Sequence, residues 1–155
     1  WKRLPDLLRK SGESGALSRL QAYTADSVAL LGYLADQLPT KVDKIFKMAE
    51  DEEALLTVPS IVIGETLFTL LKGREVFGVE VPIEKLTVLL EVLETCRTIR
   101  LMDLGVEGWR LVMGINLPGL HDRMVVATHK LSGSKAILTN DKEILGLKEV
   151  ETIWE

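Results

Sequence analysis

The chain is poor in the residue types that build cross-links and thiolate metal centres. Among its 155 residues it has one cysteine, Cys96, and two histidines, His121 and His129. One cysteine excludes an internal disulfide and a thiolate zinc cluster, and two histidines are too few to hold zinc unaided. So little cysteine suits a reducing compartment, and we therefore expect a cytoplasmic protein.

Long apolar runs are also missing from the sequence. No apolar stretch approaches the roughly 20 residues that a helix needs to cross a bilayer. The opening WKRLPDLLRKSGESG lacks the apolar core of about 7–15 residues that a secretory signal carries. We therefore expect no membrane partner, and we treat residues 1–19 as an N-terminal extension of unknown role.

Aromatic residues make up only 5% of the chain, so a core must be built mainly from Leu, Ile and Val. Hydrophobic residues reach 46% and charged residues 27%, the balance of a globular domain. The net charge is −4, which taken alone disfavours a polyanionic partner such as RNA. The four acids selected below account for that whole excess, so the total charge does not decide the question.

From residue 20 onward, short apolar segments alternate with longer segments of helical periodicity. The pattern predicts strands at 20–25, 54–59, 97–102, 136–140 and 150–154. It predicts helices at 26–38, 41–53, 60–73, 84–96, 104–114, 121–132 and 142–146. Such alternation is typical of a parallel sheet covered on both faces. We therefore expect one domain, residues 20–155, folded as a three-layer α/β/α sandwich with a central, mostly parallel sheet.

Two of these helices carry large apolar residues whose placement the sequence also predicts. Helix 60–73 is apolar nearly all round, which indicates a buried helix that begins at Ser60 and ends at Gly73. Trp109 and Met113 in helix 104–114 are predicted to lie in the core or in a subunit interface.

Three aspartates are predicted at one edge of the sheet. Ligands of open α/β sheets bind at the carboxyl ends of the strands. Asp26 directly follows the first strand and Asp141 the fourth, and Asp122 opens the helix that must run back before the fourth strand returns. Each aspartate alone is explained as a helix N-cap, a position that Asp favours. Because caps scatter over both edges of a sheet, three acids at one edge indicate a site.

Glu65 is predicted to join this group from inside a helix. It lies five residues into helix 60–73, about 7.5 Å from its start, and its side chain leans back towards that start. Taken alone, Glu65 could instead pair with Lys72. Four acids at one edge would repel one another unless cations joined them, and carboxylate oxygens suit Mg²⁺ or Mn²⁺. We therefore predict a divalent metal site that acts on a phosphate ester.

Three stretches resemble the PIN-domain family, which includes the VapC-type toxins of toxin–antitoxin pairs and other ribonucleases. They are YTADSVALLGYL, VPSIVIGETLFTLL and GLHDRMVVATHKLSGSKAILTND, they stand in the family's order, and the resemblance covers about residues 20–154. The family's acidic positions fall on Asp26, Glu65, Asp122 and Asp141. Its supporting polar positions fall on Ser27, Thr139 and Asn140.

The resemblance implies hydrolysis of RNA phosphodiester bonds that depends on Mg²⁺ or Mn²⁺, with the four acids as catalytic residues and metal ligands. It further implies an antitoxin protein and a second copy of the chain as partners. Lys72 and Arg123 are candidate RNA contacts, with Arg74 and Lys142 as further candidates, although for each of them the preferred interpretation is a solvated surface charge. The number of metal ions stays open, because Ile144 stands where some members carry another acid.

Two other interpretations stay open beside the nuclease. A PIN-like scaffold without activity, binding RNA or protein, is disfavoured by the four acids but stays open because Val28, His129 and Ile144 depart from the usual family pattern. A phospho-acceptor signalling domain also gathers acids at a sheet edge. It typically has paired acids after the first strand and a lysine after the last, however, and this chain has neither.

Overall fold

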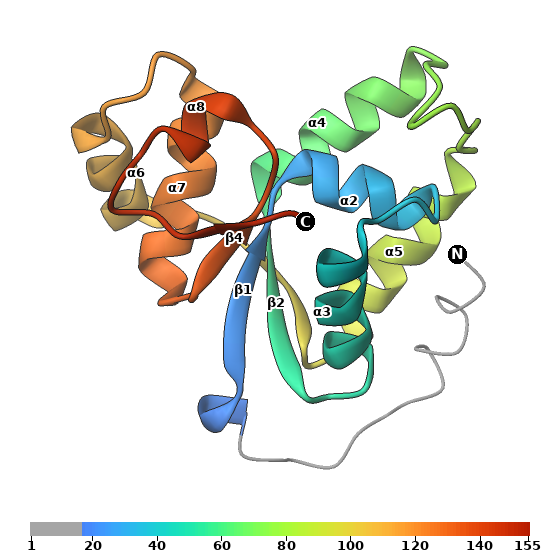
Figure 1. Cartoon of the computed structure of the whole chain (residues 1–155), viewed down its shortest axis with the longest axis horizontal. Helices are drawn as coiled ribbons and strands as arrows, with labels where there is room; N and C mark the ends of the chain where they lie inside the picture. Colours follow the sequence, from blue (N-terminus) through green and yellow to red (C-terminus); the bar gives the residue numbers. More distant parts are fainter. Residues whose placement is uncertain (1–16) are drawn as a thin grey trace.

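The computed structural model describes residues 17–155 and contains a five-stranded parallel sheet between layers of helices (Figure 1). The strands are β1 (Gln21–Ala25), β2 (Ala54–Pro59), β3 (Ile99–Met102), β4 (Ala136–Leu138) and β5 (Thr152–Ile153). Their order across the sheet is β3-β2-β1-β4-β5. The predicted three-layer α/β/α fold is confirmed. Residues 1–16 of the predicted N-terminal extension lie outside the described residues, and Leu17–Arg19 form the short 3₁₀ helix η1.

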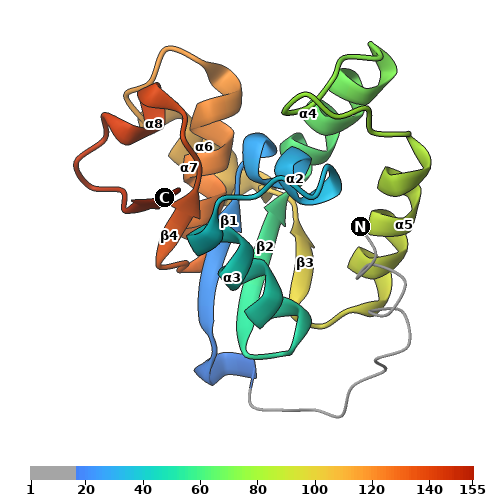
Figure 2. The same cartoon turned by 45° about the vertical axis from the view of Figure 1, so that its right-hand side comes forward.

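The helices divide between the two faces of the sheet. They are α2 (Ser27–Leu34), α3 (Thr40–Glu50), α4 (Ser60–Leu71), α5 (Glu84–Thr95), α6 (Gly105–Gly114), α7 (Leu120–Ser132) and α8 (Lys142–Leu145). Figures 1 and 2 show α3 and α5 on one face and α6 and α7 on the other, while α4 rises past the upper edge of the sheet. Within residues 17–155, no helix combines the length and the apolar character that a membrane span requires.

The register of the central strands brings their carboxyl ends to one level. β1 pairs with β2 on one side and with β4 on the other, and Ala25, the last residue of β1, lies opposite Leu138, the last residue of β4. The backbone N–H of Asp26 then donates to the Leu138 carbonyl at 3.2 Å, one residue beyond the strand. The first predicted acid is therefore fixed at the edge of the sheet by the backbone itself.

A single apolar core joins the sheet to both helical layers. All six residues of β2 are buried, as expected for a strand covered on both faces. Leu30, Phe46 and Leu89 are fully buried from three different helices, and burying each such side chain contributes about 1.5–3 kcal/mol. The continuity of this core supports the interpretation of one domain.

The prediction that helix 60–73 is buried was wrong. Only Val62, Thr66 and Leu70 of α4 are buried, whereas Leu67, Phe68 and Leu71 are exposed. The reason is the position of α4, which packs on α2 and α7 with one side and extends above the sheet with the other. The helix begins at Ser60, as predicted, but its N-cap is Pro59 and no side chain caps it.

Other differences concern the ends of elements and one helix face. The helix predicted at 26–38 ends at Leu34, because Asp36 adopts a left-handed conformation with φ of 57° that interrupts the helix. Met113, 81% exposed, and Trp109 lie outside the core, so the core alternative was wrong for both and the interface alternative stays a prediction.

Candidate metal-binding site

Asp26 is a buried carboxylate held by two hydrogen bonds. It is 5% exposed and caps α2. Its Oδ1 accepts from the Ser27 backbone N–H at 2.7 Å, and its Oδ2 accepts from the Thr139 hydroxyl at 2.6 Å. Burial raises the pKa of Asp26, while these two hydrogen bonds act in the opposite direction. The carboxylate is therefore fixed in position at the carboxyl end of β1.

Asp141 is linked to Asp26 through the same threonine. The backbone N–H of Asp141 donates to Thr139 Oγ1 at 3.0 Å. Its own Oδ1 accepts from the backbone N–H groups of Glu143 at 2.9 Å and Ile144 at 3.2 Å, which caps α8. The cap interpretation is thus correct for Asp26 and Asp141, and Thr139 joins the two caps at the sheet edge.

Asp122 is not a cap, and that interpretation was wrong. Gly119 is the N-cap of α7, and Asp122 is the third residue of the helix. A Cβ atom on Gly119 would lie 3.1 Å from Asp122 Oδ2, so the chain packs closely against this carboxylate. Burial and then the charges of Asp141, Asp26 and Glu143 raise the pKa of Asp122 to about 6. Asp122 therefore lies within electrostatic reach of both capping aspartates.

Glu65 approaches the same place from α4. It is half-buried, and its Oε2 lies 3.5 Å from Nδ1 of His121. Burial raises the pKa of Glu65 most, the charges of Asp26 and Asp122 raise it further, and His121 lowers it. Among residues 17–155, His121 is the one basic partner of the four acids. The structure thus brings the four predicted acids to one edge with little neutralising charge.

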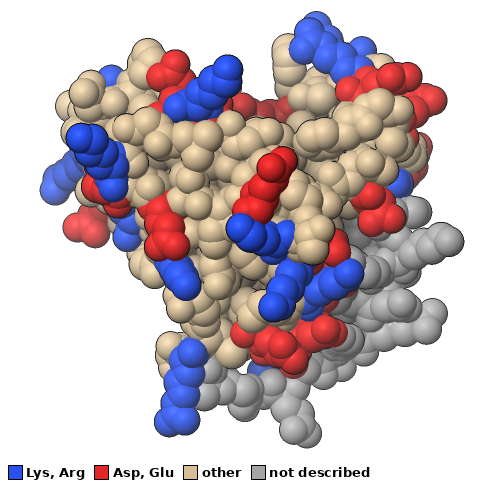
Figure 3. Space-filling view, in the orientation of Figure 1, with Lys and Arg blue, Asp and Glu red and all other residues tan. Residues whose placement is uncertain are grey.

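Two adjoining cavities open at this edge. One, of about 460 Å³, is lined by Ser27, Ile61, Gly64, Glu65, Phe68, Thr69 and His121. The other, of about 370 Å³, is lined by Glu65, Gly119, Leu120, His121 and Asp122. Glu65 and His121 line both. Figure 3 shows the molecule hollowed at the upper edge, with acidic atoms on the floor of the hollow and basic side chains on both sides of it.

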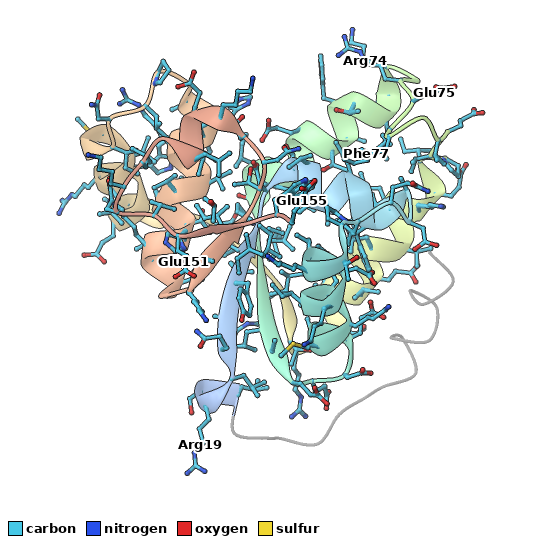
Figure 4. The ribbon with its side chains drawn as sticks, in the orientation of Figure 1. Arg19, Arg74, Glu75, Phe77, Glu151 and Glu155 are labelled. Carbon is cyan, nitrogen blue, oxygen red and sulfur yellow. The ribbon has the colours of Figure 1, made fainter. Side chains whose placement is uncertain are left out.

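The predicted RNA contacts have defined surroundings. Arg123 donates from Nε to the Leu117 carbonyl, which anchors its side chain to the segment before α7. The Lys72 ammonium lies 5.2 Å from the centre of the Phe68 ring. Figure 4 shows Arg74 beyond the end of α4, pointing away from the sheet.

The donor set suits a hard divalent cation. In residues 17–155, no three Asp, Glu, His or Cys side chains already converge into a metal-holding group. Each carboxylate offers about four acceptor sites, and the capping bonds of Asp141 all reach Oδ1, so free lone pairs remain. Mg²⁺ commonly keeps several waters and takes only one or two carboxylates directly. The acids therefore fit a cation held partly through water.

Sequence reasoning missed one residue of the site and described others incompletely. His121 was predicted only as a helix residue, and no periodicity reveals that it faces Glu65 across two helices. Ser27 supplies a backbone N–H to Asp26, and Asn140 is exposed. His129 is a buried helix residue, as predicted, and its Nδ1 forms a hydrogen bond with the Ser134 hydroxyl.

No protein-family model and no curated protein matches the sequence. Solved structures do match the fold. VapBC2 from Rickettsia felis, bound to a DNA fragment from its promoter, superposes with a TM-score of 0.63 at 12% identity, covering 87% of this chain and 100% of that one. A toxin–antitoxin complex from Klebsiella pneumoniae gives a TM-score of 0.55 at 11% identity, covering 84% and 95%. VapC20 from Mycobacterium tuberculosis, a toxin that cleaves the sarcin–ricin loop, gives 0.53 at 12% identity, covering 83% and 98%. The chain therefore has the PIN fold of VapC-like toxins.

Proposed function

We propose that this chain is a metal-dependent endoribonuclease that hydrolyses RNA phosphodiester bonds. The observation that carries the proposal is the crowding of Asp26, Glu65 and Asp122, each with a raised pKa, at the edge where Asp141 caps α8. Carboxylates that repel one another with little neutralising charge are costly to a fold, and perturbed acids in a cleft are typical of functional sites. A bound Mg²⁺ or Mn²⁺ ion would remove this repulsion.

The surroundings of each acid suggest its role in binding the cation or in orienting the attacking water. Asp26, Asp122 and Asp141 would hold the cation, directly or through water, with Thr139 fixing the first and third. Glu65, which is less constrained, would bind the cation or orient the attacking water. When bound, a divalent cation lowers the pKa of a coordinated water and offsets negative charge on a phosphate.

The proposal also includes the partners of the chain. RNA is the proposed substrate, and Lys72 and Arg123 are its proposed contacts outside the acids. The solved structures of similar fold include two toxin–antitoxin complexes, VapBC2 and the Klebsiella pneumoniae pair. We therefore propose that the chain is the toxin of such a pair, with an antitoxin protein as partner, and that it forms a homodimer in the cytoplasm.

The test is cleavage of a mixed-sequence, single-stranded RNA by the purified protein with Mg²⁺, Mn²⁺ or a chelator. Wild-type protein should cleave only with metal, and Asp122→Asn should lose at least about 100-fold in rate, the upper end of what supporting residues of a metal site cost. Glu149→Gln, an exposed acid between α8 and β5, is the matched control and should cleave normally. If the wild type neither cleaves RNA nor binds Mn²⁺, the alternative of an inactive PIN-like scaffold remains.

A further inference from the structure

The 460 Å³ cavity beside Glu65 is lined mainly by residues of α4. Apart from Glu65, these are Ile61, Gly64, Phe68 and Thr69, of which the first three recur on one side of the helix at spacings of three and four residues. Ser27, which follows Asp26, and His121, which precedes Asp122, complete the lining. The volume falls in the range of about 300–1,000 Å³ that is usual for ligand pockets, and mostly apolar walls with a few polar groups are their usual lining.

Phe68 supplies an exposed aromatic ring to this cavity. Its side chain is 57% exposed, although it borders the hollow at the acid edge. Lys72, one turn along α4, places its ammonium 5.2 Å from the ring centre. An exposed aromatic ring beside a cation is the arrangement with which proteins hold single-stranded nucleic acid, because bases stack on the ring and phosphates approach the charge.

Gly64 keeps the cavity open, and the fold does not require a glycine there. An added Cβ atom would meet no heavy atom within 4 Å, and its φ lies outside the left-handed region. A glycine inside a helix costs about 1 kcal/mol relative to alanine. Neither packing nor backbone conformation therefore explains why residue 64 is a glycine. A ligand bound in the open space beside Glu65 would explain it.

We propose that this cavity binds one unstacked nucleobase of a single-stranded RNA, next to the phosphodiester that the acids would cleave. Phe68 stacks on the base, and the Ser27 hydroxyl and the His121 ring offer hydrogen bonds to its edge. Thr69 Oγ1 donates to the Glu65 carbonyl at 3.0 Å and can therefore only accept from the base. Lys72 contacts a neighbouring phosphate. A base is favoured over an apolar protein side chain because Glu65 and His121 line both this cavity and the one that contains Asp122. The proposal rests on the proposed function, since it assigns the substrate end of the same site.

The experiment measures binding of two fluorescein-labelled strands by anisotropy in the presence of a chelator. One strand is an eight-nucleotide RNA of mixed sequence, and the other is an abasic ribose–phosphate strand of equal length. Wild-type protein should prefer the RNA by about 5- to 150-fold, the range that one base–aromatic stack provides. Phe68→Ala should lose this preference without weakening binding of the abasic strand. Phe68→Trp, which restores stacking, should retain it.

Two further variants complete the design. Gly64→Leu fills the cavity with a better helix former, so the protein should stay folded and lose the preference as Phe68→Ala does. Leu71→Ala is the control, because Leu71 is 67% exposed on the same helix but does not line the cavity, and it should bind like wild type.

Three results would overturn the proposal: no preference for RNA in the wild type, equal loss for both strands in Phe68→Ala, or full RNA binding by Phe68→Leu. The last would show that an apolar contact without stacking is sufficient. Cleavage assayed on the same samples separates the two proposals. A base preference without cleavage would contradict the nuclease alone, and cleavage without a base preference would contradict the cavity assignment alone.

Discussion

The two walls of the hollow are built in different ways. On the sheet side, Asp26 and Asp141 are fixed by backbone N–H groups and by the shared Thr139 hydroxyl. On the helix side, Glu65 meets His121 at a long 3.5 Å, and the neighbouring Phe68 is exposed. One wall is thus positioned by hydrogen bonds at strand ends, and the other by the packing of α4 against α2 and α7.

The two walls therefore differ in how firmly they hold their side chains. Buried, hydrogen-bonded carboxylates hold their geometry before any ligand arrives, as a metal site requires. A wall of exposed apolar side chains can adjust to what binds it. We therefore propose that the sheet wall mainly binds metal and the helix wall mainly recognises the substrate, and the variants below test that division.

The largest expected effect concerns two adjacent leucines of α4. Leu70 is 8% exposed and packs in the core, whereas Leu71 faces outward. Leu70→Ala should lower the free energy of unfolding by about 2–5 kcal/mol, because it leaves a cavity in the core. Leu71→Ala should change it by less than about 0.5 kcal/mol. Urea unfolding of both variants checks this, and equal losses would mean that the outer face of α4 is covered in solution.

This pair also shows why the sequence predicted the sheet better than α4. The strands were found because they are short, apolar and bounded by polar residues, and burial on both faces imposes that pattern. A helix that is apolar nearly all round gives the same signal whether its outer face meets the core or a partner. The exposure of Phe68 and Leu71 follows from where α4 ends relative to the sheet, which local periodicity does not encode.

The positions of the acids could also be predicted only where the order of strands and helices along the chain determines them. Asp26 and Asp141 come just after strands, so topology alone places them at one edge. Asp122 was placed at the correct edge, but with the wrong local role, because Gly119 begins the helix three residues earlier. The partnership of Glu65 with His121 joins α4 to α7, and no spacing along the chain reports such a contact.

The sheet wall should depend strongly on one hydroxyl. Thr139→Val keeps the shape of the buried side chain but removes the donor to Asp26 and the acceptor for Asp141. Leaving these groups unsatisfied should cost about 1–3 kcal/mol of stability. Metal-dependent cleavage should fall about 10- to 100-fold. Thr139→Ser, which retains the hydroxyl, is the control, and similar losses in both variants would show that the methyl group, not the hydrogen bonds, matters.

Crowding of the acids should make stability depend on pH. Because the pKa of Asp122 is about 6 in the folded chain and 3.8 in its ordinary state, the folded chain holds this proton more tightly. Stability is then greatest below pH 4 for this group and falls as the pH rises towards 6. The raised pKa values of Asp26 and Glu65 act in the same direction.

Asp122→Asn should remove that loss. The variant should then be more stable than the wild type above pH 6. Because the Asp122 side chain is only half-buried, solvent screening limits the increase in the free energy of unfolding to about 1 kcal/mol. Urea unfolding at pH 4 and pH 7.5 would measure it, with Glu149→Gln as the control. Added Mn²⁺ should stabilise the wild type more than Asp122→Asn, because a ligand stabilises the state that binds it. A variant less stable than wild type at pH 7.5 would contradict the repulsion.

The smallest expected effect tests the only basic partner that the described residues provide to the acids. His121→Ala removes the Glu65 contact, but the His121 side chain is 57% exposed, so the change in stability should stay below about 1 kcal/mol. Glu65 would then lose the one charge that lowers its pKa, and the pH at which cleavage reaches half its maximum should rise. His121→Lys, which places a positive charge near Glu65, should restore the original pH profile. If His121→Ala instead abolished cleavage at every pH, the histidine would belong with the sheet wall as a part of the fixed metal site, and the division between a rigid and an adaptable wall would have to be redrawn.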